Sequence, residues 1–241
     1  MATAGANAEA IRCDGVRFAW PADGAGGRPF RLEIDSLSIG RGERVALLGP
    51  SGGGKSTLLS LICGVITAQE GRVSVLGQDL AALSGPGRDR FRAEHVGVVF
   101  QLFNLLPYAS VLENLTLPLA FAPARRKRVR DEIAEAKRLL DALGVEPELL
   151  TAPARVLSVG QQQRVAVARA LIGAPEILAA DEPTSALDAD RRDSFLDLLF
   201  AEAERTGTTV VLVTHDAVVA ERFERRVALN EVARISRDLA A

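Results

Sequence analysis

The stretch Gly49-Pro50-Ser51-Gly52-Gly53-Gly54-Lys55-Ser56-Thr57 decides how this chain of 241 residues folds. It follows the apolar run 45–48 and precedes the largely apolar segment 58–63, so we expect a buried strand, a glycine-rich loop and then a helix. Glycines let successive N–H groups turn toward one anion, and the helix start adds its positive dipole end. The stretch therefore predicts a P-loop whose residues 49–57 bind a nucleotide, with Lys55 at the β- and γ-phosphates and Ser56 on Mg²⁺.

The alternative for this stretch is a glycine-rich turn that happens to hold a lysine. The flanking strand and helix disfavour that alternative, because a turn needs neither of them. Lysine is also scarce in this chain, which uses arginine for most of its 29 basic residues. A compact ammonium at Lys55 is the kind of charge that a P-loop requires.

Composition restricts the class of protein. The chain is long enough for one large domain or two small ones, and its 48% apolar and 25% charged residues are typical of a soluble globular protein. A net charge of −2 argues against a nucleic-acid partner. Cys13 and Cys63 lack zinc-ligand spacing, which favours a reducing compartment. The N-terminus does not resemble a signal peptide, and no apolar run is long enough to span a membrane.

The apolar pattern predicts the fold. Alternating apolar residues predict an antiparallel pair of strands over 11–20 and 30–39, closed by a turn-rich loop. After residue 45, apolar strands alternate with helical patterns, which is typical of an α/β fold with a mostly parallel sheet. We therefore predict a single domain over 1–241: a P-loop NTPase core (about 1–100 and 174–241), with an N-terminal antiparallel β subdomain and an inserted α-helical subdomain (about 101–173).

Local signals predict several loops and helix starts. Segment 84–87 reads as loop, and the chain from Phe223 reads as a short strand pair and a tail. Capping-box spacing predicts helix starts at Ser110 and Ser158, and aspartate caps are expected at positions 188 and 216. The basic run 125–130 is expected to be the solvated start of a helix, with contact to anionic lipid headgroups as the lesser alternative.

The segment 95–124 contains Glu113 as its single charged residue, together with three prolines. An apolar, proline-interrupted segment could be a docking surface for another protein. It could equally be an internal helical subdomain with its own small core, and composition does not choose between the two.

Polar residues follow two buried strands. Asp181 and Glu182 come directly after the apolar run 177–180, where α/β sheets bind ligands, so Asp181 suits Mg²⁺ and Glu182 could polarise an attacking water. His215 follows the strand 208–213 and could donate a hydrogen bond to a γ-phosphate. The alternative for Asp181 and Glu182 is a pair of surface carboxylates in a turn, and the alternative for His215 is a structural histidine. We assign a structural role to His95.

Together these motifs resemble the nucleotide-binding subunit of an ABC transporter, in the family's order and over nearly the whole chain. The matching pieces are residues 49–57, Gln101, the segment Leu157-Ser158-Val159-Gly160-Gln161-Gln162-Gln163-Arg164, Asp181-Glu182, Ser185-Ala186-Leu187-Asp188 and His215.

The resemblance implies catalytic and metal-binding roles. Gln101 matches the glutamine that contacts Mg²⁺ and senses the transmembrane partner. Glu182 matches the catalytic base, and His215 matches the switch histidine. With Ser56 and Asp181 also on Mg²⁺, the implied activity is ATP hydrolysis with ATP and Mg²⁺ as cofactors.

The resemblance also implies a dimer. Ser158, Gly160 and Gln161 match the signature that caps the ATP bound by the opposite subunit, and Asp188 matches an aspartate at the dimer seam. A capped helix start is an anion site, and a glycine there permits close backbone approach. The implied assembly is a head-to-tail homodimer with two ATP molecules at its interface.

Three positions test the limits of this resemblance. Trp20 falls where the family has an adenine-stacking aromatic residue. One alternative is that Trp20 is purely structural, and another is that Phe18 stacks on the adenine instead. Val159 replaces the first signature glycine, and we expect activity to survive because its N–H stays available. Asn230-Glu231 replaces the usual Asp-Gly hairpin, and we expect no C-terminal regulatory domain.

Within the family, segments 100–107 and 111–115 are similar to the ATPases of macrolide-export, lipoprotein-release and related cell-division systems. This favours docking of an integral-membrane permease on about 95–124 and a cytoplasmic location at the inner face of the membrane. The function expected is export or lipoprotein or lipid extraction, and the alternative is mechanotransmission to an extracytoplasmic cell-wall enzyme. A third hypothesis, an ABC ATPase acting on DNA or ribosomes, is disfavoured by the near-neutral charge.

Overall fold

The computed structural model describes residues 9–21, 30–185, 187 and 189–237. The chain divides into two compact units: the first consists of Met1–Asp89 and Val213–Ala241, and the second of Arg90–Leu212. This division follows spatial contacts, so the core and subdomain boundaries expected from the sequence stay a prediction. Among the described residues, no helix has both the length and the apolar character needed to cross a membrane.

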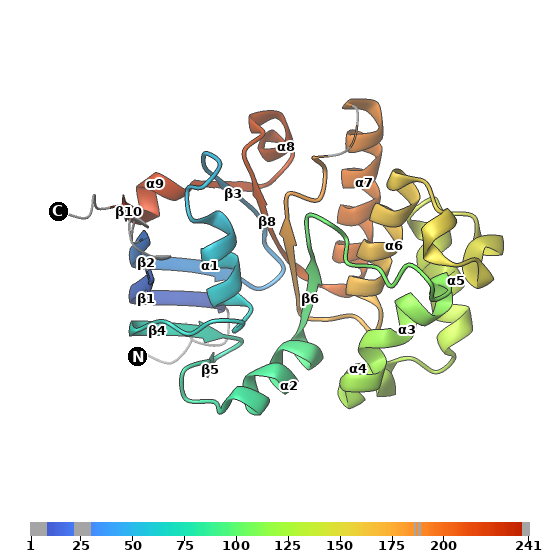
Figure 1. The fold of residues 1–241 in the computed structure, drawn as a ribbon, viewed down its shortest axis with the longest axis horizontal. Helices are drawn as coiled ribbons and strands as arrows, with labels where there is room; N and C mark the ends of the chain where they lie inside the picture. Colours follow the sequence, from blue (N-terminus) through green and yellow to red (C-terminus); the bar gives the residue numbers. More distant parts are fainter. Residues whose placement is uncertain (1–8, 22–29, 186, 188, 238–241) are drawn as a thin grey trace. The chain divides into compact units, whose positions relative to one another are not determined.

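An antiparallel sheet dominates the first unit (Figure 1), and its strand order is β10-β2-β1-β4-β5. The strands are β1 (Glu9–Trp20), β2 (Phe30–Gly40), β4 (Glu70–Val75), β5 (Gln78–Asp79) and β10 (Ala233–Arg237). Along β2 the buried positions change phase, since Ile34 and Leu37 are both buried across two exposed polar residues. The expected N-terminal antiparallel pair is confirmed, because β1 and β2 pair antiparallel. The loop expected to close this pair falls mostly outside the described residues.

The first unit also contains the nucleotide-loop elements: β3 (Arg44–Leu48), α1 (Lys55–Ile62), α8 (Ala217–Glu221), β9 (Arg225–Ala228) and α9 (Leu229–Val232). Strand β9 lies parallel to β3. The two short strands expected after Phe223 are present as β9 and β10, but they do not pair with each other, because β9 pairs with β3 whereas β10 pairs with β2. The helical turn α9, with Leu229 buried, separates the two strands and sends them to different sheets.

The second unit combines parallel strands with helices. Strands β6 (Val96–Val99) and β7 (Ile177–Asp181) are parallel, and β8 (Thr209–Thr214) follows β7 in the strand order. The helices are α3 (Val111–Phe121), α4 (Pro123–Arg128), α5 (Glu132–Ala142), α6 (Val159–Leu171) and α7 (Ala189–Thr206), with 3₁₀ turns at Pro147–Thr151 and Ala154–Val156. Strand β6 approaches α6 so closely that a Cβ on Gly97 would lie 2.2 Å from the Ala170 carbonyl oxygen.

One loop expected from the sequence is helical instead. Helix α2 (Gly85–His95) includes three of the four residues of segment 84–87 that we expected to form a loop. The Ser84 hydroxyl accepts a hydrogen bond from the Gly87 N–H, and the Ser84 carbonyl accepts one from Arg88. Proline is tolerated in a first helical turn, where its missing N–H has no partner to lose, so the turn-forming residues here start a helix.

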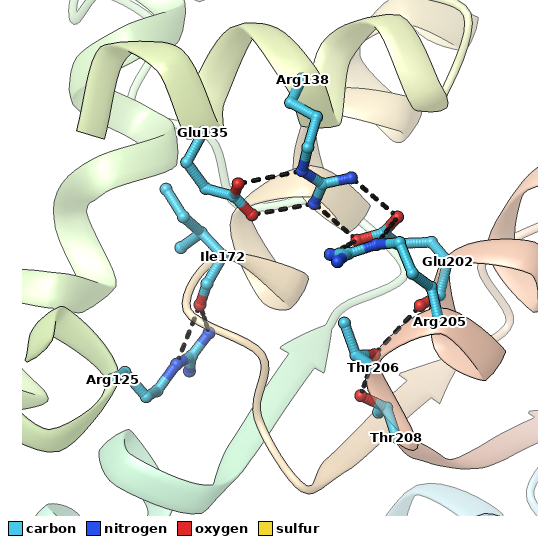
Figure 2. A network of polar contacts seen from close by, with 8 residues as sticks. All are labelled: Arg125, Glu135, Arg138, Ile172, Glu202, Arg205, Thr206 and Thr208. Atoms are coloured by element: carbon cyan, nitrogen blue, oxygen red, sulfur yellow. Dashed lines mark hydrogen bonds and ion pairs between the residues drawn. The ribbon is translucent and has the colours of Figure 1, made fainter. Parts of the chain in front are cut away.

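The expectation that the basic run 125–130 is solvated is wrong at Arg125. That residue is only 2% exposed, whereas Arg126, Lys127, Arg128 and Arg130 are exposed. The Arg125 guanidinium donates to the carbonyl oxygens of Ala93, Ala170 and Ile172, and Figure 2 shows the contact with Ile172. Burial lowers the pKa of Arg125 to about 10. The side chain is long enough to reach the end of α6, which the local sequence pattern could not indicate.

An ion-pair cluster joins α5 to α7 (Figure 2). The Glu202 carboxylate, 4% exposed, accepts hydrogen bonds from Arg138 at 2.7 and 3.0 Å and from Arg205 at 2.7 and 3.0 Å. Burial by itself would raise the pKa of Glu202, but the bonds from Arg205 and Arg138 outweigh it and lower that pKa. The cluster therefore holds α5 against α7 through a buried carboxylate.

Candidate functional site

The predicted P-loop lies between β3 and α1 in the first unit. Gly54, with φ of 78°, is the N-cap of α1, and a Cβ on Gly53 would lie 2.8 Å from the Pro50 carbonyl oxygen. Both positions therefore require glycine. The buried Lys55 side chain folds back over the loop and donates to the carbonyl oxygens of Gly49 (2.8 Å) and Pro50 (3.0 Å). The ammonium is thus held at the mouth of the loop, where a phosphate would bind.

His215 follows β8, whose last two residues, Val213 and Thr214, belong to the first unit. Within that unit, Thr214 meets the start of the P-loop. The Gly49 N–H donates to the Thr214 carbonyl at 3.3 Å. Asp216 caps α8 through the Val218 N–H, as expected, and its own N–H donates to the Thr214 hydroxyl. These bonds fix the backbone on both sides of the exposed His215, so residue 215 follows directly on the strand end that is bonded to the phosphate-binding loop.

The two aromatic residues proposed for adenine stacking differ in exposure. The Trp20 indole is 43% exposed, and its N–H donates to the Thr57 hydroxyl at 3.3 Å. Phe18 is 7% exposed and packs edge-to-face against Trp20 with the ring centroids 4.9 Å apart. Only Trp20 presents an accessible ring beside α1, so the geometry favours it over Phe18, and its stacking role stays a prediction.

In the second unit, Asp181 ends β7 and Glu182 follows it. Glu182 has a φ of 45°, in the left-handed region that non-glycine residues rarely adopt. Contacts that hold this turn include the Ser185 N–H, which donates to the Glu182 carbonyl at 3.2 Å, and the Gln163 side chain from α6, which donates to the Pro183 carbonyl. The carboxylate expected to act as catalytic base thus stands on a constrained stretch of backbone.

Gln101 lies in a tight turn directly after β6. The turn is closed by the Phe103 N–H, which donates to the Phe100 carbonyl at 3.0 Å. The Gln101 side chain is exposed, and its predicted contacts with Mg²⁺ and a transmembrane partner stay a prediction.

The predicted signature turn, which consists of residues 158–161, starts α6. The Ser158 hydroxyl accepts from the Gln161 N–H at 3.3 Å, and the Gln161 side chain accepts from the Ser158 N–H at 2.9 Å, so the capping box is confirmed. Val159 is 54% exposed. A Cβ on Gly160 would meet nothing within 4 Å, so the fold of this chain does not itself require a glycine there. Asp188, the remaining predicted interface residue, lies outside the described residues.

The predicted site residues therefore fall into two groups, each within one unit. The P-loop, Trp20 and His215 belong to the first unit, and the second unit contains Gln101, the signature turn and the Asp181–Glu182 pair. Sequence reasoning gave no individual role to Gln163, although it lies in the matching segment 157–164, and missed Arg169. These two residues of α6 contact the segments beyond Glu182 and Gln101. For Arg169 the signal was a charged side chain in the otherwise apolar run Val165–Leu171.

The side chains predicted to bind metal suit Mg²⁺ held together with a nucleotide better than a metal ion held by protein ligands alone. Among the described residues, no cluster of three histidine, cysteine or carboxylate side chains could form a protein cage. Mg²⁺ is bound in such enzymes by one or two side chains together with phosphate oxygens and water. The residues predicted for that role, Ser56, Gln101 and Asp181, supply oxygen ligands of the type that Mg²⁺ prefers.

Comparison with known proteins agrees with this reading. Residues 32–185 match the ABC transporter family model. The chain is 45% identical over 193 residues to the uncharacterized ABC transporter ATP-binding protein YbbA of Escherichia coli, covering 80% of this chain and 83% of YbbA. It is 44% identical over 194 residues to the lipoprotein-releasing system ATP-binding protein LolD 2 of Rhodospirillum rubrum, covering 80% and 83%.

Two further comparisons concern a larger protein and a solved structure. The chain is 40% identical over 196 residues to the macrolide export ATP-binding/permease protein MacB of Shigella flexneri, covering 81% of this chain and 30% of MacB. It is also similar to the dimeric ATP-binding cassette MJ0796 bound to ADP and Pi, with a TM-score of 0.77 and 32% identity over 96% of this chain and 99% of that one. The predicted α/β fold is thereby confirmed, and the chain belongs to the ABC transporter family as an ATP-binding subunit that hydrolyses ATP.

Proposed function

We propose that this ATPase powers a separate integral-membrane permease, which docks on segment 95–124, in export or in lipoprotein or lipid extraction. One observation carries the proposal: five apolar side chains of this segment remain exposed in the second unit. They are Phe100 (44%), Leu102 (84%), Tyr108 (74%), Leu117 (37%) and Phe121 (67%). Exposed apolar surface of this kind marks a site of protein interaction.

The interior of the same segment is ordered by polar contacts. The fully buried Asn114 side chain accepts from the Leu106 N–H at 2.8 Å and donates to the Leu106 and Ser110 carbonyls, each at 3.0 Å. These bonds fix the backbone beneath the exposed side chains. A partner would therefore meet a preformed surface, which reduces the entropy cost of docking.

The ATPase roles are assigned on the same proposal. Lys55 and the P-loop N–H groups would hold the phosphates, and Ser56, Gln101 and Asp181 would supply oxygen ligands to Mg²⁺. Glu182 orients and deprotonates the attacking water, and His215 donates a hydrogen bond to the γ-phosphate. Trp20 stacks on the adenine.

The complete site is formed in a head-to-tail homodimer, with Ser158, Gly160 and Gln161 capping the ATP of the opposite subunit. The open space at Gly160 supports this part of the proposal, because it leaves room for close approach from outside the chain. Asp188, which lies outside the described residues, is assigned to the dimer seam by the family resemblance alone. The subunit works at the cytoplasmic face of the membrane that holds its partner.

The names of the relatives support the choice of partner. LolD 2 is described as part of a lipoprotein-releasing system and MacB as a macrolide exporter with its own permease. In MacB the permease belongs to the same chain, whereas YbbA and LolD 2 are matched over 83% of their length. The proposal of a permease on a separate chain follows the example of YbbA and LolD 2.

The test is capture of the Glu182→Gln variant from detergent-solubilised membranes with ATP present, followed by identification of the proteins that come with it. We expect an ATP-dependent dimer on size-exclusion chromatography and a co-purifying integral-membrane protein. Recovery of soluble factors or nucleic acid instead would refute the permease assignment, and a monomeric Glu182→Gln would refute the composite site. The outer domain of a recovered partner would separate export or extraction from mechanotransmission.

A matched pair of surface variants locates the docking site. Phe121→Asp in the Glu182→Gln background should abolish capture of the membrane protein. Val65→Asp changes an exposed apolar side chain of the first unit (57%, against 67% for Phe121) and should leave the capture unchanged. Equal loss in both variants would refute docking on segment 95–124.

A further inference from the structure

The loop after Gln101 has an unusual backbone. Phe103 and Asn104 are consecutive non-glycine residues with φ of 59° and 50°, in the left-handed region. Side chains rarely tolerate this conformation, so the surroundings must stabilise it. The same Phe103 closes the turn around Gln101 through its N–H. The direction of the Gln101 side chain therefore depends on whatever holds residues 103 and 104.

A buried arginine holds them. Arg169 is 9% exposed, and its guanidinium donates to the Phe103 carbonyl at 2.6 Å and to the Asn104 carbonyl at 2.7 Å. Burial lowers the pKa of this arginine. Both partners are backbone carbonyls, so the guanidinium binds a short stretch of main chain and does not form an ion pair with either of them. The forked guanidinium matches two neighbouring carbonyls in a way that the single ammonium of lysine does not.

The helix that carries Arg169 is the one that starts at the signature turn. Helix α6 has Ser158 as its N-cap, and its Gln163 side chain donates to the Pro183 carbonyl, next to Glu182. Gln163 is fully buried, and its amide oxygen has no hydrogen-bond partner among the described residues. One rigid element of the second unit thus contacts the segments that follow Gln101 and Glu182.

We propose that Arg169 is a positioning residue that holds the loop carrying Gln101 against helix α6, so that this loop and the signature turn move as one body. The catalytic consequence rests on the proposed function, because it assumes that Gln101 contacts Mg²⁺ and senses the permease. The clamp itself is a structural statement and can be tested without that assumption.

The direct test is the mobility of the loop in the full chain. A nitroxide is attached at Leu102→Cys, an 84% exposed position, and Cys13 and Cys63 are both buried. Electron paramagnetic resonance spectra are then compared for the parent, Arg169→Met and Arg138→Met. We expect a more mobile label in Arg169→Met and an unchanged label in Arg138→Met, since Arg138 bonds Glu135 and Glu202 elsewhere in the unit. Equal mobility in Arg169→Met and the parent would overturn the proposal.

The second readout is the ATPase reaction of the same variants without the label. We expect Arg169→Met to lower kcat about 10- to 100-fold, since small displacements of a positioned group have effects of this size. The half-saturating Mg²⁺ concentration should rise by about tenfold, as for loss of a residue that orients a metal ligand. The KM for ATP should change less than either, and Arg138→Met should keep the parent Mg²⁺ dependence.

A softer substitution covers the case in which Arg169→Met does not fold. Arg169→Lys keeps the charge and should give an intermediate label mobility, because one ammonium replaces two directed donors. Increased mobility together with an unchanged Mg²⁺ dependence would support the clamp and overturn the role given to Gln101 in the proposed function. An immobile label in both Arg169 variants would overturn the clamp.

Discussion

Replacing the buried Arg125 by methionine should destabilise the second unit more than any substitution in the exposed part of the same basic run. Methionine keeps most of the apolar stem but has no donors. Three carbonyl oxygens, those of Ala93, Ala170 and Ile172, then lose partners at 3.2, 2.8 and 3.0 Å. The Glu94 cap of the α4 backbone does not involve the side chain of residue 125, so it remains in the variant.

The size of the effect follows from these contacts. A buried polar group left without its hydrogen bond costs about 1–3 kcal/mol, which gives an upper range near 9 kcal/mol for three carbonyls. Removing the guanidinium also removes the cost of burying a charge, and the end of a helix can rearrange toward water, so we expect a net loss of about 3–5 kcal/mol. For a chain of this length that corresponds to a fall in Tm of about 6–20 °C.

Thermal and urea unfolding of the purified chain, followed by circular dichroism, measure this loss. Lys127→Met is the matched control, because it removes an exposed charge from the same helix and should change stability by less than about 0.5 kcal/mol. If Arg125→Met unfolds within about 1 kcal/mol of the parent, the buried guanidinium does not stabilise the unit and the reasoning fails.

Two further predictions concern nucleotide binding and acid stability. Lys55→Ala should weaken ATP binding about 10- to 100-fold, because a charge-assisted bond to phosphate is worth about 1.5–3 kcal/mol; equilibrium binding measures it, and normal affinity would contradict the P-loop role. The Glu202 carboxylate has a pKa below its usual range in the folded chain, so its stabilising effect is present above the unfolded pKa of about 4.3 and is lost as pH falls through the folded value. The free energy of unfolding should therefore decline below about pH 4.3, and Glu202→Gln should flatten that decline. An identical slope in the two proteins would show that another group controls acid stability.

The sequence by itself determined the features that depend on neighbouring residues. The P-loop follows from glycines between an apolar strand and a helix, and the capping boxes at Ser110 and Ser158 follow from a spacing of three residues. The Asp216 cap is equally local. A local pattern determines a local structure when the atoms that interact lie within one helical turn, because the geometry of the turn then brings them together. The family and the ATPase activity could be predicted on the same basis.

The tertiary structure decided what depends on residues far apart in the chain. Arg125 and Ile172 are separated by 47 positions, and Arg169 and Asn104 by 65. A basic run looks solvated from its own sequence, and an arginine in the apolar run Val165–Leu171 carries no sign of its partner. The strands after Phe223 joined different sheets for the same reason, since pairing is decided by the strands available in space. Long side chains and strand edges bond whatever the fold brings within reach, and only packing of the whole unit determines what that is.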